Sequence, residues 1–132
     1  MQKLVQFANA IADETRWRII QLLAEDALCV CELADILKRP QSSVSSHLQI
    51  IRKADLLDSE RCEKWIYYRL NSRSRSIVAE LSTRFHSSTA SDATLARDVK
   101  IAKTRLAQRG ESCCPGPRKL ASNRRKVLRA SA

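Results

Sequence analysis

The chain has 132 residues, enough for one compact domain and too few for two, and 44% of them are hydrophobic, which can supply a core. Its formal net charge is +10, which improves solubility and also favours a polyanion such as nucleic acid as partner. Because no stretch approaches the roughly 18 consecutive apolar residues of a membrane span and no secretion signal is visible, a cytoplasmic protein with reduced thiols and no membrane partner is expected.

The low content of turn residues predicts a mostly helical body, since there are only two glycines and three prolines. Residues 2–12 have the apolar spacing of a short amphipathic helix. Residues 13–26 predict a second helix, which the side chain of Asp13 can cap. Residues 31–38 predict a third helix of about two turns.

The next segment predicts a break followed by a longer helix. Pro40 disfavours helical geometry at Arg39, and a helix resumes over residues 41–57. Val44, Leu48 and Ile51 recur at helical spacing and predict its inner face. Two helices joined by a tight break, the second polar on its outer side, are typical of a helix-turn-helix.

A β-hairpin is expected after the helix-turn-helix. Residues 56–60 and 65–71 predict two strands with 61–64 as their turn, so the fold class is mainly α with a small β-hairpin: a dimeric winged helix-turn-helix. Residues 73–109 predict one long helix or two, whose sparse apolar stripe suits packing against a partner subunit. The expected division is therefore a DNA-binding and dimerisation domain, 1–109, and a basic, cysteine-containing flexible tail, 110–132.

Four segments resemble the arsenic-repressor family (ArsR/SmtB). They are ADETRWRIIQLLAE, LCVCEL, PQSSVSSHLQIIRKADLL and KWIYYRLN, and the resemblance covers roughly residues 4–71. It implies a homodimeric winged-helix repressor that binds operator DNA and leaves it when a thiophilic ion binds. Ala34 stands where the arsenic site of the family often has a third cysteine, and the pair Cys113–Cys114 occurs only in some members.

The candidate metal ligands are Cys29, Cys31, Cys113 and Cys114. On a regular helix, side chains at i and i+2 point about 200° apart, so Cys29 and Cys31 can share an ion only if the helix end unwinds. The positive end of the helix dipole is expected to lower the pKa of these thiols and favour thiolates. Ion binding is thereby expected to distort the helix that supports the DNA-reading helix.

Arsenite or antimonite is the expected inducer, with no organic cofactor. Thiolates select soft ions, and the family resemblance supplies the preference of trivalent arsenic and antimony for three sulfurs. Cys113 or Cys114 could give the third sulfur, form a separate site or have no role; Cys62, in the wing, is expected to be incidental. Buried, inert thiols are the structural alternative for Cys29 and Cys31.

The outer face of the helix that begins at residue 41 predicts the DNA contact, on operator DNA expected to be an imperfect palindrome. Polar side chains there can read base edges, and basic side chains flanking them can bind phosphates. The candidates are Arg39, Gln41, Ser42, Ser43, Ser45, Ser46, His47, Gln49, Arg52, Lys53, Arg61 and Lys64.

The sequence therefore favours a transcriptional repressor of a metalloid-resistance operon that arsenite or antimonite releases from DNA. One alternative keeps DNA binding but changes the signal to thiol oxidation or to another soft ion such as cadmium, lead or zinc. The other is a thiol enzyme. It is disfavoured because no C-x-x-C motif stands in a βαβ pattern and no catalytic partner for the cysteines is evident.

Overall fold

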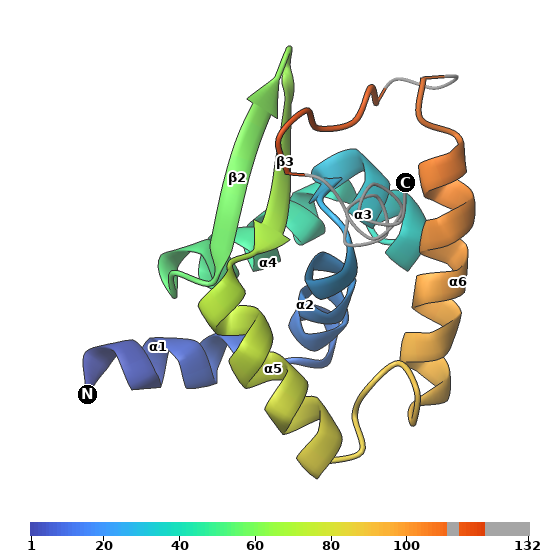
Figure 1. Cartoon of the computed structure of the whole chain (residues 1–132). Coiled ribbons are helices and arrows are strands. Elements are labelled where there is room, and N and C mark those ends of the chain that lie inside the picture. The colour runs from blue at the N-terminus through green and yellow to red at the C-terminus, as the bar shows by residue number, and fades with distance from the viewer. Residues whose placement is uncertain (111–113, 121–132) are drawn as a thin grey trace, which may run out of the picture.

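The computed structural model describes residues 1–110 and 114–120, and within them the chain forms a winged helix-turn-helix (Figure 1). Six helices and a three-stranded sheet make up this described part. In chain order they are α1 (Gln2–Ile11), α2 (Glu14–Glu25), β1 (Leu28–Cys29), α3 (Val30–Leu37), α4 (Gln41–Lys53), β2 (Leu57–Cys62), β3 (Trp65–Leu70), α5 (Ser72–Arg84) and α6 (Ala93–Ala107).

The helix boundaries follow local sequence signals. The side chain of Asp13 accepts a hydrogen bond from the backbone N–H of Arg16 at 3.0 Å, which confirms the predicted cap of α2. Helix α3 ends at Lys38, whose φ of 54° is left-handed, and Pro40 precedes the first residue of α4. The predicted break between the two helices of the DNA-reading unit is therefore confirmed.

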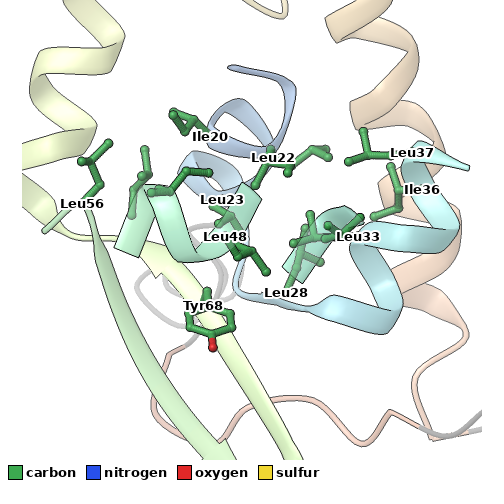
Figure 2. Close-up of a cluster of buried hydrophobic side chains, with 14 of the residues drawn as sticks. Ile20, Leu22, Leu23, Leu28, Leu33, Ile36, Leu37, Leu48, Leu56 and Tyr68 are labelled. Atoms are coloured by element: carbon green, nitrogen blue, oxygen red, sulfur yellow. The ribbon is translucent and has the colours of Figure 1, made fainter. Parts of the chain in front are cut away.

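The hydrophobic core lies where α2, α3 and α4 meet the base of the sheet. Val44, Leu48 and Ile51 are buried, as their spacing predicted. Figure 2 shows Ile20, Leu22 and Leu23 of α2 gathered with Leu33, Leu48 and Tyr68 from the neighbouring elements. Because α4 is held from behind by this core, its opposite face is left to solvent.

The sheet is antiparallel with the order β1-β3-β2, and it corrects the predicted hairpin in two ways. The turn comprises only Glu63 and Lys64, because Arg61 and Cys62 continue β2 and pair with β3. The left-handed φ of Glu63 allows this tight reversal without glycine. The short strand β1 pairs with β3 and was not predicted, since two residues carry no readable alternation.

The region after the wing forms two helices, and the second corrects an expectation. Helix α6 packs on α2 and α3 of its own chain, with Leu95, Asp98, Ala102 and Arg105 buried, rather than being left for a partner subunit. Arg18 of α2 donates two hydrogen bonds to the carboxylate of Asp98, at 2.8 and 2.9 Å. The apolar stripe of α6 therefore packs on the core of its own chain, and the pair of Arg18 with Asp98 adds a polar contact to it. No helix among the described residues combines the length and apolarity needed to cross a membrane.

Candidate metal centre and DNA-binding surface

The two cysteines of the C-x-C motif belong to different elements. Cys29 is the last residue of β1 and the N-cap of α3, with an extended backbone at φ −95° and ψ 172°, whereas Cys31 lies inside the first turn of α3. Because Cys29 is outside the helix, the helical angle between positions i and i+2 does not separate the two side chains. The expectation that the helix must unwind to bring them together is therefore wrong.

Three sulfur atoms converge at this point. The Sγ atoms of Cys29, Cys31 and Cys114 all lie within 4.8 Å of one another, and those of Cys29 and Cys114 are 3.5 Å apart. Cys113 lies outside the described residues. Cys62 is buried in the same small cluster as Cys29 and Cys114, but it is not in the group of three whose sulfurs could share an ion.

A buried ion pair between Glu32 and Arg109 fixes the elements that carry the thiols. Glu32, in the first turn of α3, is fully buried and accepts a hydrogen bond from the backbone N–H of Cys29 at 3.1 Å. Arg109, just beyond α6, donates to both oxygens of the Glu32 carboxylate at 2.7 and 2.9 Å and to the carbonyl of Ala27 at 2.6 Å. The C-terminal end of α6 is thereby fixed beside the thiols, where Cys114 follows.

The electrostatics of the site correct the expected effect of the helix dipole. Burial raises the pKa of the Cys29 thiol far above its ordinary value, and the N–H of Glu32 only partly opposes this rise. Without an ion, Cys29 is a neutral thiol at neutral pH. At the third sulfur, the Nη2 of Arg105 lies 3.6 Å from Cys114 Sγ, placed to stabilise a thiolate there.

A cavity of about 200 Å³ gives access to two of the sulfurs. It lies between the start of α3 and the strand β3 of the wing. Its lining comprises Cys29, Val30, Cys31, Lys64, Trp65, Ile66 and Tyr68. Cys31 is partly exposed and Cys29 is buried, so an incoming ion would meet Cys31 first.

The predicted DNA-contacting side chains share the outer face of α4 and the hairpin. The exposed ones are Arg39, Gln41, Ser42, Ser46, Gln49, Arg52, Lys53, Arg61 and Lys64, while Ser43, Ser45 and His47 are partly buried. His47 faces inward toward α2, with its Nδ1 3.3 Å from Arg16 Nη1 and 3.9 Å from Asp13 Oδ2. Most of the predicted DNA-contacting side chains are therefore open to solvent on α4 and the hairpin.

Several residues of the site were missed by the sequence analysis. Glu32 stands three positions after Cys29, which is the spacing of a capping box with cysteine in place of serine. Arg105 and Arg109 lie four residues apart and so share one side of the end of α6. The Glu32 signal could have been found in the sequence, whereas the partners of the two arginines depend on how α6 packs.

The fold and the site define a DNA-binding winged-helix transcription regulator that carries a cluster of thiols. Residues 13–59 match the model of the family described as bacterial regulatory protein, arsR family. The chain is 37% identical to an uncharacterised HTH-type transcriptional regulator of Methanocaldococcus jannaschii, over 58% of this chain and 89% of that protein. The chain belongs to the ArsR family.

Other relatives differ in the toxic element that their names mention. The arsenical resistance operon repressor of Escherichia coli is 41% identical over 51% of this chain and 58% of that protein. The cadmium resistance transcriptional regulatory protein CadC of Listeria innocua is 32% identical over 60% of this chain and 67% of that protein. For several relatives, including the repressor from E. coli, the match spans only about half of their length.

Solved structures agree on the fold. HlyU from Vibrio cholerae superposes with a TM-score of 0.58 at 27% identity, covering 64% of this chain and 92% of that chain. The transcriptional repressor PagR of Bacillus anthracis superposes with a TM-score of 0.54 at 32% identity, covering 61% of this chain and 93% of that one. Family and fold thus agree.

Proposed function

We propose that this chain is a homodimeric repressor of a metalloid-resistance operon, and that arsenite or antimonite releases it from DNA by binding Cys29, Cys31 and Cys114. The observation that carries the proposal is the convergence of three sulfur atoms within 4.8 Å. Sulfur-only donor sets select soft ions over hard ones. The resistance operon is inferred from the arsenical and cadmium resistance proteins among the relatives.

The chemistry of the three donors supports a trivalent metalloid over zinc. Zinc in structural sites is usually four-coordinate, often with histidine, and the group found among the described residues offers three thiols and no imidazole. Arsenite carries three hydroxyl groups, which three thiols can replace with release of three water molecules. Cys29 would then lose its proton to the leaving hydroxyl group, despite the pKa that burial raises.

Binding to DNA is proposed through α4 and the wing of each subunit. The exposed Gln49 and Ser46 lie where they can meet base edges, and Arg52, Lys53 and Arg61 flank them toward the phosphates. The second subunit is inferred from apolar side chains left uncovered on α1 and α5. Leu4, Val5 and Phe85 are 71%, 60% and 73% exposed. Two-fold symmetry would place the paired α4 helices on an imperfect palindrome.

The test is a DNA-binding titration under full reduction with arsenite, antimonite and cadmium in separate arms. The DNA is a duplex selected from a random library by the wild-type protein. Cys29→Ser, Cys31→Ser and Cys114→Ser are each expected to bind DNA normally and to lose most of the response to arsenite. Cys62→Ser is the matched control, since that thiol is buried nearby but outside the group of three. A full response from all three variants would place the sensor elsewhere.

Thiol oxidation is the second candidate signal, and one distance favours it. The sulfurs of Cys29 and Cys114 are 3.5 Å apart, close enough for a disulfide after a small movement. Hydrogen peroxide would accept two electrons from the two thiols, giving one disulfide and two molecules of water. Release of DNA by peroxide alone, with no release by arsenite under reduction, would favour this function over the metalloid.

A further inference from the structure

Three residues from three strands occupy one row across the sheet. Cys29 of β1 pairs with Tyr67 of β3, and Tyr67 pairs in turn with Glu60 of β2. Side chains of directly paired residues stand on the same face of a sheet. The row therefore leads from the thiol site at one edge of the sheet to the outer strand of the wing at the other.

Residues 114–120, named here the strap, contact each member of this row in order. Cys114 Sγ lies 3.5 Å from Cys29 Sγ, and the N–H of Gly116 donates to Tyr67 Oη at 2.8 Å. The last three residues, 118–120, donate their backbone N–H groups to the Glu60 carboxylate at 2.5, 2.6 and 2.8 Å. Figure 1 shows the strap, in orange-red, passing from the end of α6 to the side of β3.

Glu60 accepts the hydrogen bonds of the strap as a charged carboxylate. Burial raises the pKa of Glu60, but the three backbone N–H donors together outweigh it and hold the pKa below its ordinary value. The carboxylate is therefore ionised at neutral pH. Hydrogen bonds to an ionised acceptor are shorter and stronger than those between neutral groups.

The strap has little slack between its two ends. Only Pro115, Gly116 and Pro117 separate Cys114 from the first residue that Glu60 holds, and each proline ring fixes its own φ. Gly116 has a left-handed φ of 94°, and a Cβ there would come within 3.3 Å of the Arg109 side chain. Cys114 and residues 118–120 are thus linked by a short segment, so that the position of Cys114 bears directly on the residues that Glu60 holds.

The far end of the strap reaches a surface proposed to meet DNA. Glu60 belongs to the same strand as Arg61, whose side chain points to the opposite face of the sheet, and Arg118 and Lys119 are exposed where the strap ends. The strap therefore joins the candidate ion site to the strand of the wing that carries Arg61 and brings two basic residues of its own beside it.

We propose that Glu60 is the coupling residue of this regulator: by fastening the strap to the wing, it makes ion capture at Cys29, Cys31 and Cys114 change how the wing meets DNA. This inference rests on the proposed function, in which those thiols bind the inducer. Glu60 does not touch the ion. It is a positioning residue, whose loss separates ion binding from release of DNA.

The first experiment compares Glu60→Ala and Glu60→Gln with wild type in the full-length chain. Each variant is measured for arsenite binding and for DNA binding with and without arsenite. We expect the ion-free DNA affinity and the arsenite affinity to stay within about threefold of wild type, while the arsenite-induced loss of DNA affinity shrinks about tenfold or more in Glu60→Ala. Glu63→Gln is the matched control, since it removes the same charge from the exposed turn of the same hairpin.

The outcomes are distinct. A full response to arsenite in Glu60→Ala overturns the coupling, and so does loss of arsenite binding, which would make Glu60 part of the site itself. If wild type binds arsenite and keeps its DNA, the proposed function fails instead. Hydrogen exchange on the wild type needs no variant: protection of residues 114–120 and of β2 should change on adding arsenite, and unchanged protection in both overturns the proposal.

Discussion

Arg109 and Glu32 form a buried, two-pronged ion pair, with hydrogen bonds of 2.7 and 2.9 Å to the two oxygens of one carboxylate. Glu32 is fully buried and Arg109 nearly so. The pair joins the end of α6 to the first turn of α3. Cys29 and Cys31 lie at the start of α3, and Cys114 follows the end of α6, so the pair holds both segments together. Its removal should therefore affect both the stability of the fold and the assembly of the site.

Replacing Arg109 by Leu should lower the free energy of unfolding by about 3–5 kcal/mol, because it leaves the Glu32 carboxylate buried without its partner. Urea denaturation followed by circular dichroism measures this. Arg84→Leu is the control, since its pair with Glu80 is 3.5 Å long and both side chains are exposed. That change should cost less than about 1 kcal/mol. Equal losses of unfolding free energy in the two variants would show that burial of the Arg109–Glu32 pair does not determine its contribution to stability.

The cap of α2 predicts a dependence on pH. The backbone N–H of Arg16 is the main cause that lowers the pKa of Asp13 from its ordinary value of 3.8. The charged Asp13 therefore adds stability that is complete above pH 3.8 and is lost as the pH falls through the lower folded-state value. At pH 7, Asp13→Ala should cost about 1 kcal/mol and Asp13→Asn only a few tenths, because asparagine also caps. A larger loss for Asn than for Ala would contradict the role as cap.

Arg105 should strengthen binding of the inducer through Cys114. Its Nη2 lies 3.6 Å from the Cys114 sulfur, and the positive charge favours a thiolate. Arg105→Gln is expected to weaken arsenite binding about tenfold, measured by competition with a dithiol chelator, whereas Arg105→Lys should recover part of the loss. Arg97→Gln, on the exposed side of the same helix, is the matched control. Wild-type affinity in Arg105→Gln would remove Arg105 from the site.

The DNA surface should separate residues that read bases from those that bind phosphates. Gln49→Ala is expected to weaken binding to the selected operator by about 1–3 kcal/mol with little change for random DNA. Arg52→Ala should weaken both and reduce the salt slope by about one. Fluorescence anisotropy at several salt concentrations distinguishes them. The same loss on both DNAs for Gln49→Ala would mean that α4 does not read sequence.

The exposed apolar side chains of α1 predict a dimer contact. Leu4→Glu should shift the protein toward monomer in sedimentation velocity and lower the affinity for a palindromic operator more than for a half-site. Lys3→Glu, which also adds a negative charge to α1, is the control. If Leu4→Glu and wild type sediment alike, α1 is not part of the contact between subunits.

The elements with a strong local signal could be predicted from the sequence. The spacing of Val44, Leu48 and Ile51 placed the inner face of α4, and Asp13 marked the start of α2. The three cysteines of the candidate site were all among the ligands predicted from the sequence, but the geometry of Cys29 and Cys31 was predicted wrongly. The error arose because the two-residue strand β1, which moves Cys29 out of the helix, exists only through its pairing with β3.

The remaining part of the candidate site depends on long-range packing. Nothing in the neighbourhood of Cys114 indicates that it lies beside Cys29, or that Glu60 holds residues 118–120. Both contacts require α6 to pack on its own chain, which polar pairs such as Arg18 with Asp98 make possible. The apolar spacing predicted the helix itself but could not show on which elements it packs.

The division of the chain into a domain of residues 1–109 and a tail of residues 110–132 stays a prediction.

The two sulfurs that nearly touch, those of Cys29 and Cys114, are 85 residues apart in the chain. A ribosome would therefore finish α4, the wing and the six described helices before it delivers the third thiol of the group. If the proposed function holds, premature stop codons or frameshifts just beyond α6 would give a protein that still binds operator DNA but no longer responds to the inducer. In a cell that makes both forms, a truncated subunit could pair with a complete one. Such a mixed dimer would keep the operon repressed in the presence of arsenite, so the truncating mutation would be dominant.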